Sequence, residues 1–229
     1  MTEAVDKYKK YLGKRATSFK LALDSIAKKQ NPVVVELGTS RSFVSGGNEG
    51  VMSDDSKYWE PNNIDKWDWG AGIFSRVAAE AIEGTNSKFY AVDPCPKAIT
   101  ISSTITDDLE SDISFHQTTS TEFLNNFDTK IDLLYMDHHE TCEEGARLHL
   151  LDSKLIIEKD SLSKDALILI DDVHVKRWSE PIKKVYRKLR NKPRLHFGKG
   201  KYSIPYLEES GFEIIYEGYQ VVMAKSESI

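Results

Sequence analysis

Residues 31–43 read NPVVVELGTSRSF and predict a buried strand that ends in a sharp turn. Three consecutive valines without polar alternation are typical of a strand covered on both faces at the centre of a parallel sheet. Gly38 permits a tight turn or a close backbone approach, and Glu36 places a carboxylate just before that turn. The turn is therefore a candidate ligand site.

Length and composition predict one soluble domain spanning residues 1–229. The hydrophobic share of 40% and the charged share of 29% are ordinary for a globular protein, and no apolar run approaches the roughly 20 residues that span a bilayer. A polar N-terminus and only two cysteines predict no signal peptide and no disulfide framework, so a cytoplasmic location is expected. The net charge of -5 argues against a general nucleic-acid binder.

Helical and strand patterns alternate along the chain. A helix within residues 1–30 is expected to cover the sheet, and Ser120 or Thr121 is expected to cap a helix that follows the third strand. The alternation predicts an α/β fold with a mostly parallel, seven-stranded sheet, helices on both faces and a C-terminal antiparallel hairpin. We expect helices at 70–82, 120–127, 143–158 and 182–189, strands at 33–37, 88–93, 113–119, 130–137 and 166–172, and the hairpin at 211–225.

Acids follow several of the predicted strands, and a parallel sheet brings such residues together at the carboxyl ends of its strands. A dinucleotide is one candidate ligand there, which would make the protein a nicotinamide-dependent oxidoreductase. However, Gly38 is followed by Thr39, Ser40 and Arg41 and lacks the second and third glycines of the dinucleotide fingerprint. Asp93 also lies much further from Gly38 than the roughly 20 residues expected in that motif.

From residue 33 to 225 the chain resembles the class I S-adenosylmethionine-dependent methyltransferases. The resemblance rests on the Glu-Leu-Gly turn after the first strand, on the acids that end the second and fourth strands, and on the final hairpin. It implies a Rossmann-like fold and S-adenosylmethionine as the cofactor. The residues that it implies for the methionine part are Glu36, Gly38, Thr39 and Ser40, with Asp93 at the ribose and Ser120 near the adenine.

A second group of acids lies in the segments YMDHHE and LIDDVH. Three unpaired carboxylates at one sheet edge would repel one another, and Mg²⁺ or another hard divalent cation would relieve this. The pattern is similar to the metal-dependent O-methyltransferases of the catechol and macrolide-sugar types. This resemblance implies Asp137, Asp171 and Asp172 as metal ligands, with Asp137 between cofactor and metal. Nearby histidines leave Mn²⁺, Fe²⁺ and Zn²⁺ open as well.

The expected function is therefore metal-assisted methyl transfer to a hydroxyl group of a small molecule, with Asp137 and His139 as catalytic residues. His138 and His174 flank the same acids, but His139 is our candidate for the general base. Two alternatives stay open: a protein of this fold that binds the cofactor without methylating, and the less favoured oxidoreductase. The identity of the acceptor and the oligomeric state do not follow from the sequence.

Two segments match no family pattern. Residues 44–69 form an insertion that holds Trp59, Trp67 and Trp69, and we expect either a lid over the site or a flap packed on the sheet edge. Residues 176–201 are strongly basic, which fits a solvated outer face or an attraction for an anionic substrate. RNA is a weaker candidate, because no aromatic side chains for base stacking alternate with these charges.

Overall fold

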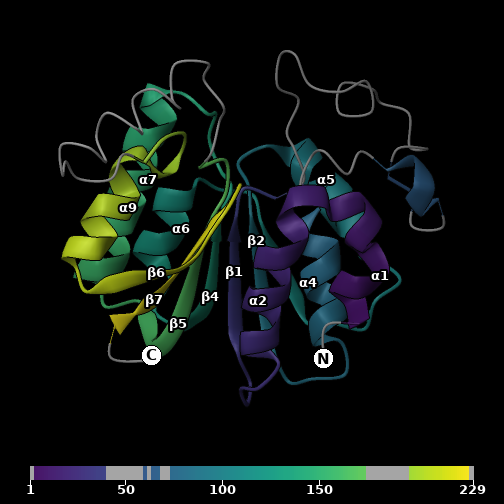
Figure 1. Cartoon of the computed structure of the whole chain (residues 1–229). Helices are drawn as coiled ribbons and strands as arrows, with labels where there is room; N and C mark the ends of the chain where they lie inside the picture. Colours follow the sequence, from purple (N-terminus) through teal and green to yellow (C-terminus); the bar gives the residue numbers. More distant parts are fainter. Residues whose placement is uncertain (1–2, 40–58, 61–62, 68–72, 174–195, 227–229) are drawn as a thin grey trace.

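A seven-stranded sheet forms the centre of the molecule (Figure 1). The computed structural model describes residues 3–39, 59–60, 63–67, 73–173 and 196–226. Strands lie in the order β3-β2-β1-β4-β5-β7-β6, and only β7 runs antiparallel to its neighbours in this described sheet. The predicted fold class is confirmed. The strands are β1 Val33–Leu37, β2 Lys88–Val92, β3 Ile113–His116, β4 Ile131–Met136, β5 Leu162–Ile170, β6 Phe212–Glu217 and β7 Val221–Lys225.

Strand β1 lies at the centre, as its valines predict. All five of its residues are buried, and it pairs in parallel with both β2 and β4. Val34 faces one layer of the core, whereas Val35 and Leu37 face the other. The chain order reverses between β1 and β4, so the carboxyl ends of these two strands diverge into different loops and form the usual ligand crevice of such sheets.

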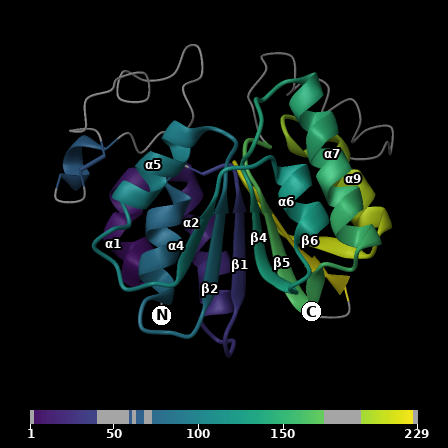
Figure 2. The same ribbon diagram turned by 180° about the vertical axis from the view of Figure 1, so that it is seen from behind.

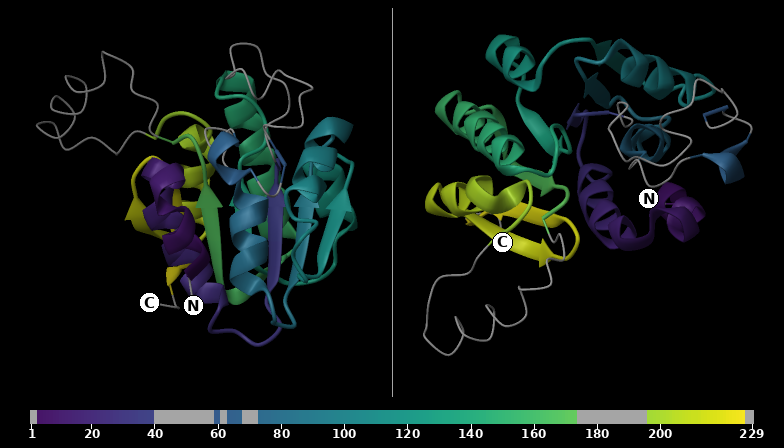
Figure 3. Two further views of the ribbon diagram at one scale, coloured as in Figure 1. Left: turned by 90° about the vertical axis from the view of Figure 1, so that its right-hand side faces the viewer. Right: turned by 90° about the horizontal axis from the view of Figure 1, so that it is seen from above.

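Helices cover both faces of the sheet (Figures 2 and 3). One face carries α1 Glu3–Leu12, α2 Ala16–Ile26, α4 Phe74–Ile82 and α5 Pro96–Thr104. The other face carries α6 Ser120–Asn126, α7 Glu143–Glu158 and α9 Gly200–Glu209. Each layer packs its apolar residues against one face of the sheet. The carboxyl ends of the strands, where the loops begin, therefore stay free for a site.

The prediction of a single N-terminal helix within residues 1–30 is wrong in one respect. A short 3-10 turn, Gly13–Arg15, divides it into α1 and α2. Gly13 has a φ of +53°, a left-handed conformation that ends an α-helix and that glycine adopts without strain. The break directs Arg15 toward the carboxyl edge of the sheet, where it contacts Asp171.

Other expectations hold with smaller changes. The helix at Glu143–Glu158 is confirmed, and Gly84 follows α4 with a φ of +70°. The predicted cap of α6 is wrong by one residue, because the Thr119 side chain accepts the hydrogen bond from the Glu122 amide. Helices α5 and α9 were not predicted, and the expected helix at 182–189 lies outside the described residues.

Candidate active site

The turn after β1 is shaped by a close approach to the turn after β4. Gly38 has a φ of +81° and donates its amide to the Val92 carbonyl at 2.8 Å. A Cβ on this residue would lie 2.6 Å from both the amide nitrogen and the Cα of His138. Real Cβ atoms do not come this close to a backbone, so only glycine fits here. The requirement explains the glycine of the Glu-Leu-Gly turn.

A cavity of about 390 Å³ opens at this edge of the sheet. Most of the side chains predicted for cofactor and catalysis line it, and they come from the ends of β1, β2 and β4 and from the start of α6. Glu36 and Asp171 lie behind its wall and are fully buried, and Ser40 lies outside the described residues. The predicted residues that line the cavity are Gly38, Thr39, Asp93, Ser120, Asp137, His139 and Asp172.

Glu36 carries a buried carboxylate that is only partly satisfied within the described part of the chain. Its Oε2 accepts a hydrogen bond from the Ser75 hydroxyl, whereas its Oε1 has no partner among the described residues. Burial raises the pKa of Glu36 well above its usual value. A buried acceptor without a partner is unfavourable. Because Glu36 lies behind the wall of the cavity, its contact with the methionine part of the cofactor stays a prediction.

Asp93 ties the first two turns of the site together. One carboxylate oxygen accepts the Thr39 amide at 3.2 Å, and the other accepts the Cys95 amide at 2.8 Å. A carboxylate oxygen accepts hydrogen bonds from hydroxyl groups. The two ribose hydroxyls are donors of this kind, so the chemistry of the residue fits its predicted place. Its position on the cavity wall is consistent with that role.

Asp137, Asp171 and Asp172 come together as predicted, but they are not unpaired. Lys199 lies 2.6 Å from Asp137 and 3.4 Å from Asp172, and it is 4% exposed. Arg15 forms an ion pair with Asp171 at 2.9 Å. The argument that led from unpaired carboxylates to a metal is thus wrong in its premise, because two buried cations already neutralise most of this charge.

The charge balance around these carboxylates still affects Asp137. Burial and the neighbouring Asp171 carboxylate raise the pKa of Asp137 to about 7, although Lys199 opposes the shift. The Tyr135 hydroxyl lies 3.0 Å from an oxygen of Asp137 and 3.0 Å from an oxygen of Asp171. A carboxylate with this pKa can accept a proton near neutral pH, which suits a general base.

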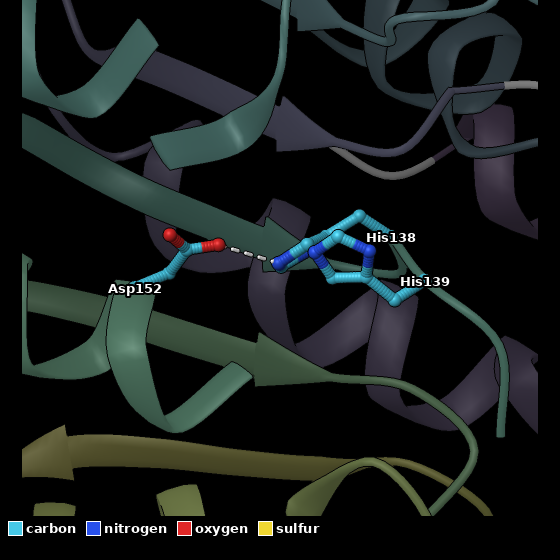
Figure 4. A group of neighbouring side chains, drawn as sticks. All are labelled: His138, His139 and Asp152. Atoms are coloured by element: carbon cyan, nitrogen blue, oxygen red, sulfur yellow. Dashed lines mark hydrogen bonds and ion pairs between the residues drawn. The ribbon is translucent and has the colours of Figure 1, made fainter. Parts of the chain in front are cut away.

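His138, His139 and Asp152 form a cluster at the wall of the cavity (Figure 4), and His149 packs next to it. His138 Nε2 lies 2.7 Å from Asp152, and the His138 ring stacks on His149 with centroids 4.2 Å apart. Ligand atoms of His138, His139 and Asp152 lie within 4.8 Å of one another, which is compatible with a metal ion. Asp152 already accepts hydrogen bonds from the hydroxyls of Ser120 and Thr121, so it primarily links α6, α7 and the turn after β4.

His139 is exposed at the cavity and has an unusual backbone. Its φ is +62°, a left-handed conformation that is uncommon outside glycine and asparagine. Although the residue is exposed, partial desolvation of its ring and the neighbouring His138 lower the pKa of His139 to about 4. The imidazole is therefore neutral near pH 7, but with this pKa it is a weak base, and Asp137 is the better match for proton removal.

Several cavity residues were not predicted from the sequence. Arg15, Lys199 and Tyr219 reach the site from the N-terminal 3-10 turn, the start of α9 and the turn between β6 and β7. The Tyr219 hydroxyl donates a hydrogen bond to Asp172. Lys199 belongs to the basic segment 176–201, but nothing in the sequence distinguishes it from the other cations there. Arg15 and Tyr219 stand in no local motif.

The described part of the 44–69 insertion packs on the helical layer and does not line the described cavity. Trp67 is buried against α1 and α4, and its indole donates to the Glu60 carbonyl at 2.7 Å. Trp59 packs against the same cluster. The choice between a lid and a flap stays a prediction, because residues 44–58 and Trp69 lie outside the described residues. His174 and the basic residues 176–195 also lie outside them. No described helix has the length and apolarity needed to cross a membrane.

Comparisons with known proteins identify the fold. Residues 69–173 match a family model described as a methyltransferase domain. None of the curated proteins matches the sequence. Among solved structures, the cofactor-bound Rv0187 from MTB is similar with a TM-score of 0.55 and 10% identity, over 97% of this chain and 89% of that one.

Two further structures are similar over most of their length. The O-methyltransferase TomG from Streptomyces achromogenes, in complex with SAM, has a TM-score of 0.53 and 11% identity over 98% of this chain and 91% of its own. The N-methyltransferase NodS from Bradyrhizobium japonicum, in complex with S-adenosyl-l-homocysteine, has a TM-score of 0.51 and 13% identity over 97% and 98%. Residues 69–173 therefore match a methyltransferase domain, and the chain has the Rossmann-like fold of the class I S-adenosylmethionine-dependent methyltransferases.

Proposed function

We propose that the protein transfers a methyl group from S-adenosylmethionine to a hydroxyl oxygen of a small molecule. The observation that carries the proposal is the single cavity that joins the predicted cofactor residues Gly38 and Asp93 to the acid Asp137. S-adenosylmethionine supplies an activated methyl group on a sulfonium, and the reaction is an in-line displacement that depends mainly on alignment. The protein then has to hold the cofactor, orient the acceptor and remove one proton.

The choice of oxygen as the acceptor rests on Asp137. A neutral hydroxyl is a weak nucleophile and has to lose its proton as it is methylated, whereas a neutral amine is nucleophilic enough to attack while it still carries its protons. Asp137 lines the cavity, and its raised pKa lets it take that proton near neutral pH. The acceptor oxygen bonds to the methyl carbon as the carbon–sulfur bond breaks, the proton goes to Asp137, and S-adenosylhomocysteine leaves.

A direct test is the release of S-adenosylhomocysteine from S-adenosylmethionine with matched acceptors. We expect product with phenolic, polyketide or sugar hydroxyls and none with the corresponding amines. Transfer to amines alone would contradict the choice of oxygen. Cofactor binding without transfer to any acceptor would favour the alternative of a binding protein without methylation activity.

Replacement of Asp137 by Asn tests its role as the base. The variant keeps the size of the side chain but cannot accept the proton, so turnover should fall by about a hundredfold or more. Binding of S-adenosylhomocysteine should be retained, because Asp137 does not serve as a predicted cofactor ligand. Unchanged turnover in this variant would show that another group removes the proton.

A further inference from the structure

Lys199 lies among the three aspartates, at the place predicted for a divalent cation. Six carboxylate oxygens converge there, and each has a donor from the protein itself. Asp137 contacts Lys199 and Tyr135, Asp171 contacts Arg15, Tyr135 and the Asp172 amide, and Asp172 contacts Tyr219, Thr141 and Lys199. A divalent cation needs several of these oxygens as direct ligands, so it would have to displace the ammonium group of Lys199.

The charges of Lys199 and Arg15 match those of the ion that they would replace. Together these side chains supply two positive charges, as one divalent cation would. Both are largely buried, at 4% and 14% side-chain exposure, where an ion pair is screened little by solvent. The burial of three carboxylates is therefore compensated without a metal.

The local chain geometry holds Lys199 in this place. Gly198 has a φ of +60°, and a Cβ there would lie 1.8 Å from the Asp172 carbonyl oxygen. The Lys199 amide donates to the same carbonyl at 3.4 Å. This close approach brings the start of α9 against the turn after β5, and the lysine side chain then reaches across to Asp137.

The ammonium group also faces the cavity. Two of its contacts are short, at 2.6 Å to the Asp137 carboxylate and 2.8 Å to the Asp137 carbonyl, whereas its contact with Asp172 is 3.4 Å long. A lysine ammonium has three donors. The contact with Asp172 is thus the weakest of the three, and it is the one that an acceptor oxygen in the cavity could replace.

We propose that Lys199, supported by Arg15, takes the place of the divalent cation in this protein and that its ammonium group contacts the acceptor oxygen. The inference rests on the proposed methyl transfer. Lys199 would stabilise the negative charge that develops on the oxygen as Asp137 removes the proton. Methyl transfer by this protein is then independent of added metal.

Titration with Mn²⁺ tests the proposal on the intact protein. We expect the wild-type protein, saturated with S-adenosylhomocysteine, to bind Mn²⁺ only weakly in calorimetry or electron paramagnetic resonance. Lys199→Ala removes the competing ammonium and leaves three converging carboxylates, so it should bind Mn²⁺ at least about tenfold more tightly. Lys201→Ala, two residues away and paired with Glu143 at the surface, should behave like the wild type.

Two results would overturn the proposal. One is tight Mn²⁺ binding by the wild-type protein, and the other is a Lys199→Ala variant that binds Mn²⁺ no better than the wild type. If Lys199→Ala does not fold, Lys199→Gln serves for the same comparison, and the wild-type titration stands without any variant. Binding of S-adenosylhomocysteine alone is measured separately: its absence would refute the proposed function, whereas the Mn²⁺ results bear on Lys199.

Once an acceptor is known, the role of Lys199 in contacting it has its own readout. EDTA should leave wild-type turnover unchanged. Lys199→Ala should lower kcat much more than it changes the KM for S-adenosylmethionine, because the lysine acts on the acceptor oxygen. Loss of turnover in EDTA that Mg²⁺ restores would contradict the inference.

Discussion

Gly38 shows how a single residue fixes the geometry of the site. Both Gly38 and Gly84 have a left-handed φ, but a Cβ would meet backbone only at Gly38, and at Gly84 it would meet nothing within 4 Å. Gly84→Ala should therefore lower the free energy of unfolding by only about 1 kcal/mol, the cost of the backbone conformation. Gly38→Ala adds a steric clash and should lower it by about 3 kcal/mol or more.

Urea denaturation of the two variants distinguishes the cost of the left-handed backbone conformation from the cost of the steric clash. The Gly38 variant should also lose affinity for S-adenosylhomocysteine, because relief of the clash moves the turns after β1 and β4 apart. Equal losses of stability at the two glycines would mean that the close approach of Gly38 to His138 is not a determinant of the fold.

His149 gives the protein a dependence on pH. It is fully buried, and burial together with the nearby His138 lowers its pKa well below the usual value. Below about pH 6.5 the unfolded chain binds a proton at this residue that the folded protein does not, so stability is lost as the pH falls. From about pH 7.5 to about pH 5.5 this single group should lower the free energy of unfolding by about 1.4 kcal/mol.

The variant His149→Gln checks the source of this effect. Gln keeps a donor for the His138 carbonyl, which His149 Nε2 meets at 2.8 Å, but it does not titrate. The variant should be less stable at about pH 7.5 and should lose less stability on acidification. The same pH dependence in wild type and variant, measured by urea denaturation, would rule out His149 as its cause.

Some residues of the site could be predicted and others could not, for a physical reason. Asp93 and Asp137 follow apolar strands, and the parallel topology alone brings such positions to one edge. Arg15 contacts Asp171 across 156 positions of the chain, and Lys199 contacts Asp137 across 62. Their places depend on how whole helices pack, which no local pattern records. The sequence therefore suggested unpaired carboxylates at a place where the structure pairs them with Arg15 and Lys199.

At the level of elements, Arg76 connects three helices on one face of the sheet. It extends from α4, is 3% exposed, and donates to the Ile105 carbonyl at 2.9 Å and to the Tyr8 hydroxyl at 3.2 Å. It also pairs with Asp108 just after α5. Truncation leaves these partners without their donor, so Arg76→Ala should lower the free energy of unfolding by about 3 kcal/mol or more.

Arg147→Ala is the control for this substitution, because it removes an exposed arginine from another helix. Arg147 lies on α7, has 70% side-chain exposure and pairs with Glu143 at 3.4 Å. An exposed pair of this kind contributes less than about 1 kcal/mol, so its loss should be barely measurable. Similar effects of the two substitutions on urea denaturation would show that Arg76 does not join the helical layer.

Elements with strong local patterns were predicted well, and those set by context were not. Helix α7 has both a clear pattern and a first turn rich in acids, and its predicted bounds are the observed ones. Helix α9 contains Pro205, begins at Gly200 and follows Gly198, so its sequence does not indicate a helix. Packing of Ile204 and Leu207 against the sheet stabilises it despite this composition.

At the scale of the whole molecule, the sheet gathers residues from distant segments into one cavity. Its central strands β1 and β4 are almost entirely buried and carry the site at their carboxyl ends, and the two helical layers pack against these strands. The structural likeness to methyltransferases of 11% and 13% identity shows that this arrangement persists while the sequence changes. Our central claim is that S-adenosylmethionine binds in this cavity.

Calorimetric titration with S-adenosylhomocysteine tests that claim most directly, on the wild type, on Asp93→Asn and on the exposed control Asp107→Asn. The account predicts one site of about micromolar affinity in the wild type and in the control. Asp93→Asn should bind at least about tenfold more weakly, because it loses charged hydrogen bonds to the ribose. No binding by the wild-type protein would contradict the assignment of the cofactor, and equal binding by all three would contradict the role of Asp93.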